Sequence, residues 1–322
     1  MNEFELIERY FRRAPRNADV RIGVGDDGAV IAPAPGMEYV LTTDMLVEGR
    51  HFTADADPAR LGHKTLAVNL SDLAAMGALP RFALLAVALP APDAEWVAAF
   101  MRGFDALATQ YDVELIGGDT TRGPRNLCVT AIGELPAGTA LTRAGANPGD
   151  IVYVSGRLGD AALALAAAAD RTGVDEAALP LLRERLDAPE PRVALGVALR
   201  GVATSAIDLS DGLTGDLGHI LDASRVGASL DLAAIPCSDE LRARLAGAER
   251  DLALQCILAG GDDYELCFTA RPAMREHVDA VALALGLPLT AIGAIGVDAG
   301  LAIRDEHGRL LPSLPHAFDH FA

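Results

Sequence analysis

The chain has 322 residues, a length that suits about two domains with buried cores. Its 27 Lys and Arg against 45 Asp and Glu give a net charge of −18, and no Lys/Arg-rich run relieves the repulsion of a nucleic acid backbone. With 51% hydrophobic and 22% charged residues, the composition is that of a globular protein, which excludes large-scale disorder.

The sequence also argues against a membrane or secreted protein. Its longest apolar stretches, residues 82–89 and 161–169, fall well short of the ~20 residues that a membrane span needs. The N-terminus, MNEFELIERYFRR, is amphipathic with mixed charges and has no apolar signal region. None of the four cysteines forms a C-x-x-C pair, which favours free thiols. We therefore expect a cytoplasmic protein with neither membrane nor nucleic acid as a partner.

Short apolar runs alternate with helical patterns, as is typical of α/β layers. Asp57 and Pro58 supply an N-cap and a first helical residue, so a helix is expected from there to Gly77. A second helix should begin at Asp93, with aromatic residues at helical spacing on its core face. The strands expected in this first half are residues 40–43, 82–89, 113–116 and 127–135.

A stretch rich in turn residues, 136–150, is the best candidate linker between two domains, which we place at residues 1–140 and 148–322. Beyond it we expect strands at 151–155, 203–209 and 264–269, and helices at 161–169, 213–223 and 273–285. The last strands should flank a hairpin turn at 305–308.

Acidic residues cluster beside glycines or threonines next to strand-like runs. The clusters are GDDG at 25–28, TTD at 42–44, GGDT at 117–120, DLSDG at 208–212 and GGDD at 260–263. Any one of them would usually be a simple turn. Carboxylates at strand ends, beside glycines that let the backbone approach a ligand, suit oxygen-preferring cations such as Mg²⁺. Their recurrence in both halves predicts a metal site.

One polar stripe lies on the first expected helix. Thr65, Asn69 and Asp72 share a face at helical spacing, next to an apolar face. The stripe is either a solvated helix side or a surface that faces the metal site, and the sequence leaves both open.

Familiar nucleotide and hydrolase motifs are excluded. Residues 23–28 match G-x-G-x-x-G, but residues 29–33 are β-branched and end in proline, so the helix that a dinucleotide fold needs is not expected there. The sequence has no Walker A motif, no G-x-S-x-G elbow and no H-E-x-x-H zinc helix.

Together, the segments resemble the thiamine-monophosphate kinase family, part of the ATP-binding superfamily that also holds aminoimidazole ribonucleotide synthetase and selenophosphate synthetase. The matching segments run in order over nearly the whole chain: 25–30, 42–52, 67–77, 117–120, 143–150, 207–213, 260–265 and 318–321. The stretches 42–52 and 208–213 are the most specific.

The resemblance implies a two-domain α/β fold of the aminoimidazole ribonucleotide synthetase type, with mixed sheets. Residues 1–140 would form an ATP- and Mg-binding domain whose sheet pairs across a homodimer, and residues 148–322 a layered α/β domain. The implied reaction is ATP-dependent phosphorylation of thiamine monophosphate to thiamine diphosphate, in a cleft between the domains.

The resemblance also assigns site residues by motif. Several Mg²⁺ ions would be held by Asp27, Thr42, Thr43, Asp44, Asp72, Asp119, Asp208 and Asp211. ATP would contact Gly118, Asp119, Arg143 and Ser210. The thiamine substrate would meet His51, Asp262 and Phe318.

Residue chemistry is compatible with this assignment. Both reactants are polyanions, so an acidic protein needs cations to hold them, and the acceptor phosphate is already ionised, so no general base is required. Arg143 can offer a fork to a phosphate, and Phe318 a flat face to a thiamine ring. His51 could equally be a satisfied histidine beside a strand end.

One departure from the family pattern affects the substrate contacts. The family usually has Glu where this chain has Asp262, so the neighbouring Asp263 could make the contact instead.

Related enzymes of the superfamily are distinguished by their cysteines. Selenophosphate synthetases have a reactive N-terminal Cys and a hydrogenase-maturation relative has a C-terminal one, whereas the first cysteine here is Cys128 and the last residues are His-Phe-Ala. Both are therefore disfavoured. An aminoimidazole ribonucleotide synthetase and a non-catalytic Mg-nucleotide-binding module stay open as competing hypotheses.

Overall fold

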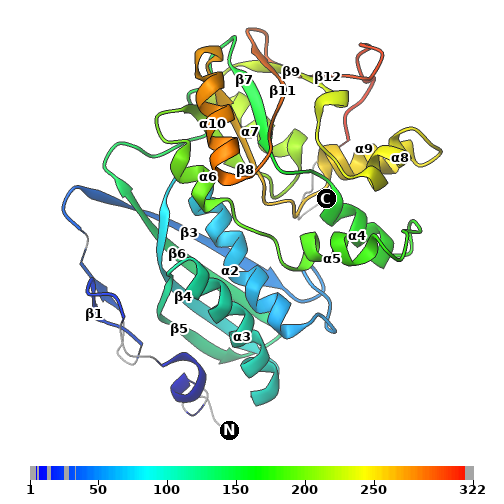
Figure 1. The fold of residues 1–322 in the computed structure, drawn as a ribbon. Helices are drawn as coiled ribbons and strands as arrows, with labels where there is room; N and C mark the ends of the chain where they lie inside the picture. Colours follow the sequence, from blue (N-terminus) through cyan, green and yellow to red (C-terminus); the bar gives the residue numbers. More distant parts are fainter. Residues whose placement is uncertain (1–4, 6, 13–15, 25–28, 33, 316–322) are drawn as a thin grey trace. The chain divides into compact units, whose positions relative to one another are not determined.

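A computed structural model describes residues 5, 7–12, 16–24, 29–32 and 34–315 of the chain. The chain divides into two compact units (Figure 1). The first unit comprises residues 1–73 and 78–140, and the second comprises residues 74–77 and 141–322.

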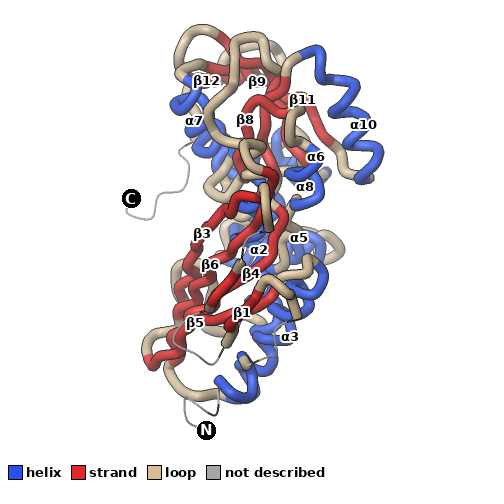
Figure 2. Tube along the Cα trace, turned by 90° about the vertical axis from the view of Figure 1, so that its left-hand side faces the viewer, coloured by secondary structure: helices blue, strands red, loops and turns tan. Residues whose placement is uncertain are grey.

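The first unit is built on a mixed sheet with the strand order β3-β6-β4-β5, in which only β4 and β5 pair in parallel. Helices α2 and α3 both lie against one face of this sheet (Figures 1 and 2). In chain order the elements are η1 Ile7–Phe11, β1 Val20–Ile22, β2 Val30–Ile31, β3 Met37–Val47, α2 Pro58–Ala75, β4 Leu79–Leu89, α3 Ala94–Gln110, β5 Glu114–Arg122 and β6 Asn126–Pro136.

Both predicted helices of this unit are confirmed, with their caps. The Asp57 carboxylate accepts a hydrogen bond from the Arg60 backbone N–H at 2.8 Å at the start of α2. Asp93 caps α3 by accepting from the backbone N–H groups of Glu95 and Trp96, each at 3.1 Å. The aromatic face of α3 is core, as expected, since Phe100 and Phe104 are buried.

The strands of this unit are longer than predicted, and one prediction about them is wrong. The strand expected at 113–116 continues to Arg122 as β5. The prediction ends the strand at the two glycines 117–118, but parallel pairing with β4 keeps the backbone extended through them. Asp44 and Asp119 therefore lie within strands and not at strand ends.

The second unit contains a larger mixed sheet with the order β12-β9-β11-β7-β10-β8, in which β12 and β9 are parallel and the other pairs antiparallel. Figure 2 shows α7 and α10 on opposite sides of this sheet. Its elements are β7 Ile151–Ser155, α4 Asp160–Ala168, α5 Leu179–Asp187, α6 Val193–Ala198, β8 Ala203–Asp208, α7 Leu213–Ser224, β9 Gly227–Asp231, η2 Leu232–Ala234, α8 Asp239–Leu245, α9 Arg250–Ala259, β10 Leu266–Ala270, η3 Pro272–Met274, α10 Arg275–Leu285, β11 Leu289–Gly296 and β12 Gly300–Arg304.

Neighbouring residues of a strand point to opposite faces of the sheet, so the buried residues of this unit lie on both faces. Val152, Val154 and Cys267 join the main apolar cluster with residues of α4, α7 and α9. Tyr153 and Phe268 point to the other face, where their rings stack at 5.2 Å between centroids.

The C-terminal hairpin is only partly as predicted. β12 precedes the turn, and the Asp305 carboxylate accepts from the backbone N–H groups of His307 and Arg309, each at 2.9 Å. After the turn a single bridge joins Arg304 to Leu310, and no second strand forms within the described residues. The backbone N–H of Leu311 donates to the Ile303 carbonyl oxygen at 2.9 Å, so the two sides pair only close to the turn.

Three further observations concern the motif match, the helices and the cysteines within the described ranges. The G-x-G-x-x-G match is followed by the strand β2 and not by a helix. No helix among the described residues is long and apolar enough to cross a membrane. All four cysteines are free; Cys128 is half-buried and the other three are buried.

Candidate functional site

In the first unit, strand β3 and helix α2 bring together polar residues of two predicted metal-binding segments. The Thr42 hydroxyl donates a hydrogen bond to the Asp72 carboxylate. Two residues along β3, the backbone N–H of Asp44 donates to the Asn69 side chain at 3.1 Å. Asn69 and Thr65 are buried, so the polar stripe of α2 faces the sheet and is not a solvated helix side.

Thr43 and Asp119 occupy the opposite face of the same sheet. Neighbouring residues of a strand point to opposite faces, so Thr43 turns away from Asp72, and its hydroxyl lies 3.0 Å from both the Thr130 hydroxyl and the Val129 carbonyl oxygen. The strand register aligns Asp119 with Ala86, Cys128 and Met45, and this places Asp119 on the face of Thr43. The predicted metal residues of this unit are thus divided between two faces.

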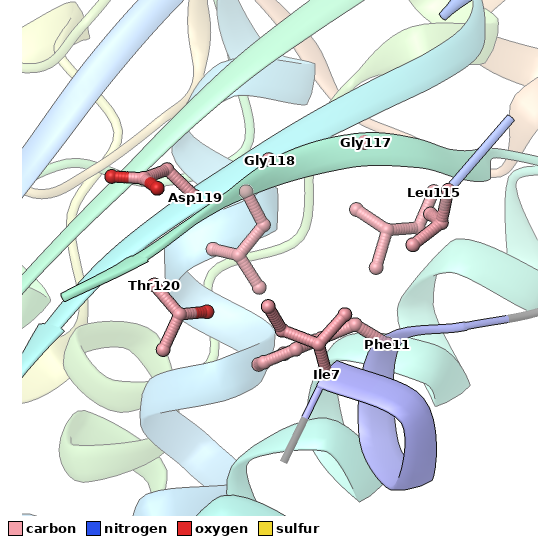
Figure 3. A pocket seen from close by; sticks show the side chains of 9 residues that line it. Ile7, Phe11, Leu115, Gly117, Gly118, Asp119 and Thr120 are labelled. Carbon is pink, nitrogen blue, oxygen red and sulfur yellow. The ribbon is translucent and has the colours of Figure 1, made fainter. Parts of the chain in front are cut away.

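A hollow beside β5 adjoins the predicted ATP-binding residues Gly118 and Asp119. Its walls are apolar side chains, the glycine backbone and two polar residues: Ile7, Phe11, Val24, Leu85, Leu115, Gly117, Gly118, Asp119 and Thr120. Figure 3 shows that Asp119 and Thr120 leave β5 on opposite sides, with Thr120 on the side of Ile7.

Gly118 has a steric reason to be glycine. Its φ is +153°, and a Cβ there would lie 1.9 Å from the backbone oxygen of Leu85 on β4. A larger residue would push β5 away from β4 next to the hollow.

His51 follows β3 in a tight turn. Its ring Nδ1 accepts a hydrogen bond from the backbone N–H of Val47 at 3.0 Å, so the neutral ring carries its proton on Nε2. The turn fixes the orientation of the ring.

In the second unit, the segment from Asp208 to Gly212 leaves the end of β8, where Asp208 is buried. A residue that the sequence analysis did not single out fixes this segment. The buried Asp216 carboxylate accepts from the backbone N–H groups of Asp211 and Gly212, each at 3.0 Å. Burial raises the pKa of Asp216 to about 7.

Backbone hydrogen bonds join this segment to the Gly260–Glu265 segment. The N–H of Asp262 donates to the backbone carbonyl oxygen of Ser210 at 2.9 Å, and the N–H of Tyr264 donates to that of Leu209 at 2.8 Å. The N–H of Leu209 donates in return to the backbone carbonyl oxygen of Glu265 at 2.8 Å. A residue expected to contact the nucleotide, Ser210, is therefore held beside one expected to contact the acceptor, Asp262.

Asp263, the alternative to Asp262 as a substrate contact, is buried and differs from Asp262 in its surroundings. Both of its carboxylate oxygens accept from the backbone N–H of Gly159, at 2.9 and 3.0 Å, and burial raises the pKa of Asp263 well above its usual range. Asp262 is half-buried, and the Tyr264 hydroxyl donates to its Oδ1 at 3.2 Å.

Behind this segment lies a buried ionic network centred on Glu265. Its carboxylate accepts from the Ser155 hydroxyl at 2.6 Å and from Arg192 at 2.7 and 2.6 Å, and Arg185 also donates to it. Burial alone would raise the pKa of Glu265, but the hydrogen bonds and charges of Arg192 and Arg185 outweigh it and lower that pKa.

The other predicted site residues are less defined. Arg143 lies in the exposed segment before β7, where its backbone oxygen accepts from the Ser224 hydroxyl at 3.2 Å. Asp27 and Phe318 lie outside the described residues. The sequence motifs gave no role to Tyr264, Glu265 or Asp216, although the first two end the matching segment 260–265.

The predicted metal-binding residues that the structure describes offer carboxylate and hydroxyl oxygens, which are the ligands that Mg²⁺ prefers. Among the residues that the structure describes, no three His, Cys, Asp or Glu side chains gather closely enough to hold an ion.

Comparisons with known proteins define the class. Residues 25–135 match the AIR synthase related protein N-terminal domain, and residues 147–306 match the corresponding C-terminal domain. The chain is thus a two-domain α/β protein of the AIR synthase related type.

Within that class, full-length similarity narrows the assignment. The chain is 47% identical over 325 residues to a thiamine-monophosphate kinase of Escherichia coli K12, covering 99% of this chain and 98% of that protein. A crystal structure of thiamine-monophosphate kinase from Stenotrophomonas maltophilia K279a has a TM-score of 0.86 and 47% identity, covering 94% and 96% of the two chains. AaThiL, solved in complex with AMPPCP and TMP, has a TM-score of 0.78 and 28% identity over 90% and 89%. The chain belongs to the thiamine-monophosphate kinase family.

Proposed function

We propose that this chain transfers the γ-phosphoryl group of ATP to thiamine monophosphate, giving thiamine diphosphate and ADP. The observation that carries the proposal is the backbone pairing of residues 209–210 with residues 262–265, which sets Ser210 beside Asp262. Membership of the family supplies the identity of the two substrates, since AaThiL was solved with an ATP analogue and TMP.

The reaction requires little covalent chemistry from the protein. The acceptor oxygen belongs to a phosphate that is ionised at neutral pH, so no residue has to remove a proton from it. The work of the chain is to align the acceptor oxygen with the γ-phosphorus and to keep the two anions together. Segments fixed by buried hydrogen bonds, such as 208–212 on Asp216, are suited to that task.

Mg²⁺ supplies charge neutralisation when it is bound. We assign the ligands of several Mg²⁺ ions to Asp27, Thr42, Thr43, Asp44, Asp72, Asp119, Asp208 and Asp211. Thr43 and Asp119 lie on the sheet face opposite Thr42 and Asp72, so these two pairs would hold different ions. Support comes from the oxygen-only donor set and from the Thr42–Asp72 pair, which presents a hydroxyl and a carboxylate side by side. With a net charge of −18, the chain itself repels both substrates, so the cations are needed for binding as well as for chemistry.

The substrate contacts form two groups. Gly118, Asp119, Arg143 and Ser210 would meet ATP, and His51, Asp262 and Phe318 would meet the thiamine substrate. The fixed His51 ring offers an N–H donor to a phosphate oxygen, and the Asp262 carboxylate accepts from a cationic or N–H-bearing group.

We also assign a cytoplasmic location and a homodimer that pairs through the first unit. Leu41 and Met45 lie on the face of β3 that turns away from α2, and Leu41 is 64% and Met45 51% exposed. Exposed apolar side chains on an open sheet face favour burial against a second copy.

The first test is a direct assay. Purified protein with ATP and Mg²⁺ is expected to convert thiamine monophosphate to thiamine diphosphate, measured by chromatography of the products. A panel of other acceptors, including formylglycinamidine ribonucleotide, serves as the control. Turnover of that ribonucleotide in place of thiamine monophosphate would move the assignment to the synthetase, and nucleotide binding without any product would favour a non-catalytic module.

The dimer has its own test. Leu41→Glu places a charge on the open face of β3 and is expected to shift the mass in sedimentation velocity from that of two chains to that of one. Leu283→Glu on α10 is the matched control, because Leu283 is 86% exposed in the second unit. A dimer that persists in the Leu41 variant, or a wild-type monomer, would contradict the assignment.

A further inference from the structure

Two residues next to each other in space carry an unusual backbone. Asp262 has φ +68° and Tyr264 has φ +49°, in the left-handed region. The other non-glycine residues with positive φ in the described chain, Asp112, Asp170 and Arg225, each lie just after a helix end, where a left-handed residue is common. A bulky tyrosine in this conformation is strained, and such strain persists only where the surroundings impose it.

The surroundings of this segment do impose it. The N–H groups of Asp262 and Tyr264 are both bonded to the segment after β8, and between them the buried Asp263 carboxylate is bonded to the Gly159 N–H. The bond from Gly159 to Asp263 fixes the middle of the segment, and the residues on either side, Asp262 and Tyr264, both have left-handed backbone conformations.

The side-chain consequence is a contact within the segment. The Tyr264 hydroxyl donates to Oδ1 of Asp262 at 3.2 Å. The Tyr264 side chain is largely buried, whereas Asp262 is half-buried, so the phenol approaches the carboxylate from the protein side. The donated hydrogen bond restricts rotation of the carboxylate, whose two oxygens can together accept several hydrogen bonds.

We propose that Tyr264 is a positioning residue that orients the Asp262 carboxylate toward a cationic or N–H-bearing group of the acceptor substrate. The inference rests on the proposed function, in which Asp262 contacts that substrate. A short aspartate has fewer bonds about which to adjust than a glutamate, so its orientation depends more on a fixed neighbour. Tyr264 acts through Asp262 and does not itself touch the reacting atoms.

The test removes the hydroxyl alone. Tyr264→Phe is expected to raise KM for thiamine monophosphate roughly fivefold to tenfold, the effect of losing one hydrogen bond to a charged group, while kcat and KM for ATP stay within about twofold. Tyr153→Phe is the matched control: Tyr153 is a buried tyrosine of β7 whose hydroxyl has no hydrogen-bond partner among the described residues, and its removal should change neither KM.

A double-mutant cycle identifies the route of the effect. Asp262→Gly removes the carboxylate and tolerates the left-handed backbone, so adding Tyr264→Phe to it should change KM for thiamine monophosphate by less than about twofold. An unchanged KM in the single variant, an equal rise in KM for ATP, or the same factor in both backgrounds would overturn the inference alone. A wild-type protein that makes no thiamine diphosphate would overturn the proposed function, and the inference with it.

Discussion

Asp208→Asn is expected to lower kcat for thiamine diphosphate formation by roughly 10²–10³-fold, the scale of losing one preorganised electrostatic group. Asp208 ends β8 with its side chain buried, and its segment is bonded to both the Asp216 carboxylate and the Gly260–Glu265 segment. The substitution keeps the size of the side chain and removes one charge from the proposed Mg²⁺ ligands. The fold should survive, because Asn can occupy the same space.

The measurement is kcat against Mg²⁺ concentration, together with the melting temperature of each variant. Asp231→Asn is the matched control: Asp231 ends β9 of the same sheet, is exposed, and accepts from the Ala233 N–H at 3.0 Å, which Asn can also do. Asp72→Asn in the first unit should resemble Asp208→Asn. A near-normal kcat at saturating Mg²⁺ would show Asp208 to be a turn residue without a role in the cation site.

Local signals predicted the helices of this fold well. The Asp57-Pro58 and Asp93 caps, with apolar residues at helical spacing behind them, define α2 and α3 because capping and amphipathicity act within a few residues. The same reasoning ends β5 at 116 because glycine usually breaks a strand, whereas pairing with the distant strand β4 extends it to Arg122.

The candidate site was predictable in its residue types but not in its arrangement. Adjacent strand residues such as Thr42 and Thr43 must face opposite sides of a sheet, so the strict alternation of a strand could have separated them at the outset. The motif gives residues in order along the chain and carries no such information.

The network around Glu265 could not have been found from local patterns. Its partners Ser155, Arg185 and Arg192 are 110, 80 and 73 positions away in the sequence. Each looks like an ordinary polar residue in its own segment. Only the folded sheet brings them to one buried carboxylate.

Breaking the Glu265 network is expected to lower the stability of the protein more than any of the substitutions described above. Arg192→Met removes two hydrogen bonds, at 2.7 and 2.6 Å, from a carboxylate whose side chain has 0% exposure, and should lower the free energy of unfolding by about 3–5 kcal/mol. Arg183→Met is the matched control on α5, because the Arg183–Asp187 pair reaches solvent, with side chains 44% and 22% exposed, and should be worth less than about 1 kcal/mol. Urea denaturation of both variants gives the comparison.

The pH dependence of that loss identifies its cause. In the wild type the pKa of Glu265 is lowered, so the folded state binds a proton on this carboxylate less readily than the unfolded state does. The stability that the charged carboxylate contributes is therefore fully present above the ordinary glutamate pKa. It disappears as the pH falls through the pKa that Glu265 has in the folded protein. Without Arg192, burial is opposed mainly by Arg185, and the pKa of Glu265 should rise. The variant can then relieve its buried charge by taking up a proton, so the gap between wild type and variant should narrow between about pH 8 and pH 5. A gap that stays constant over this range would mean that Arg192 stabilises the unit by packing alone, with no contribution from the charge on Glu265.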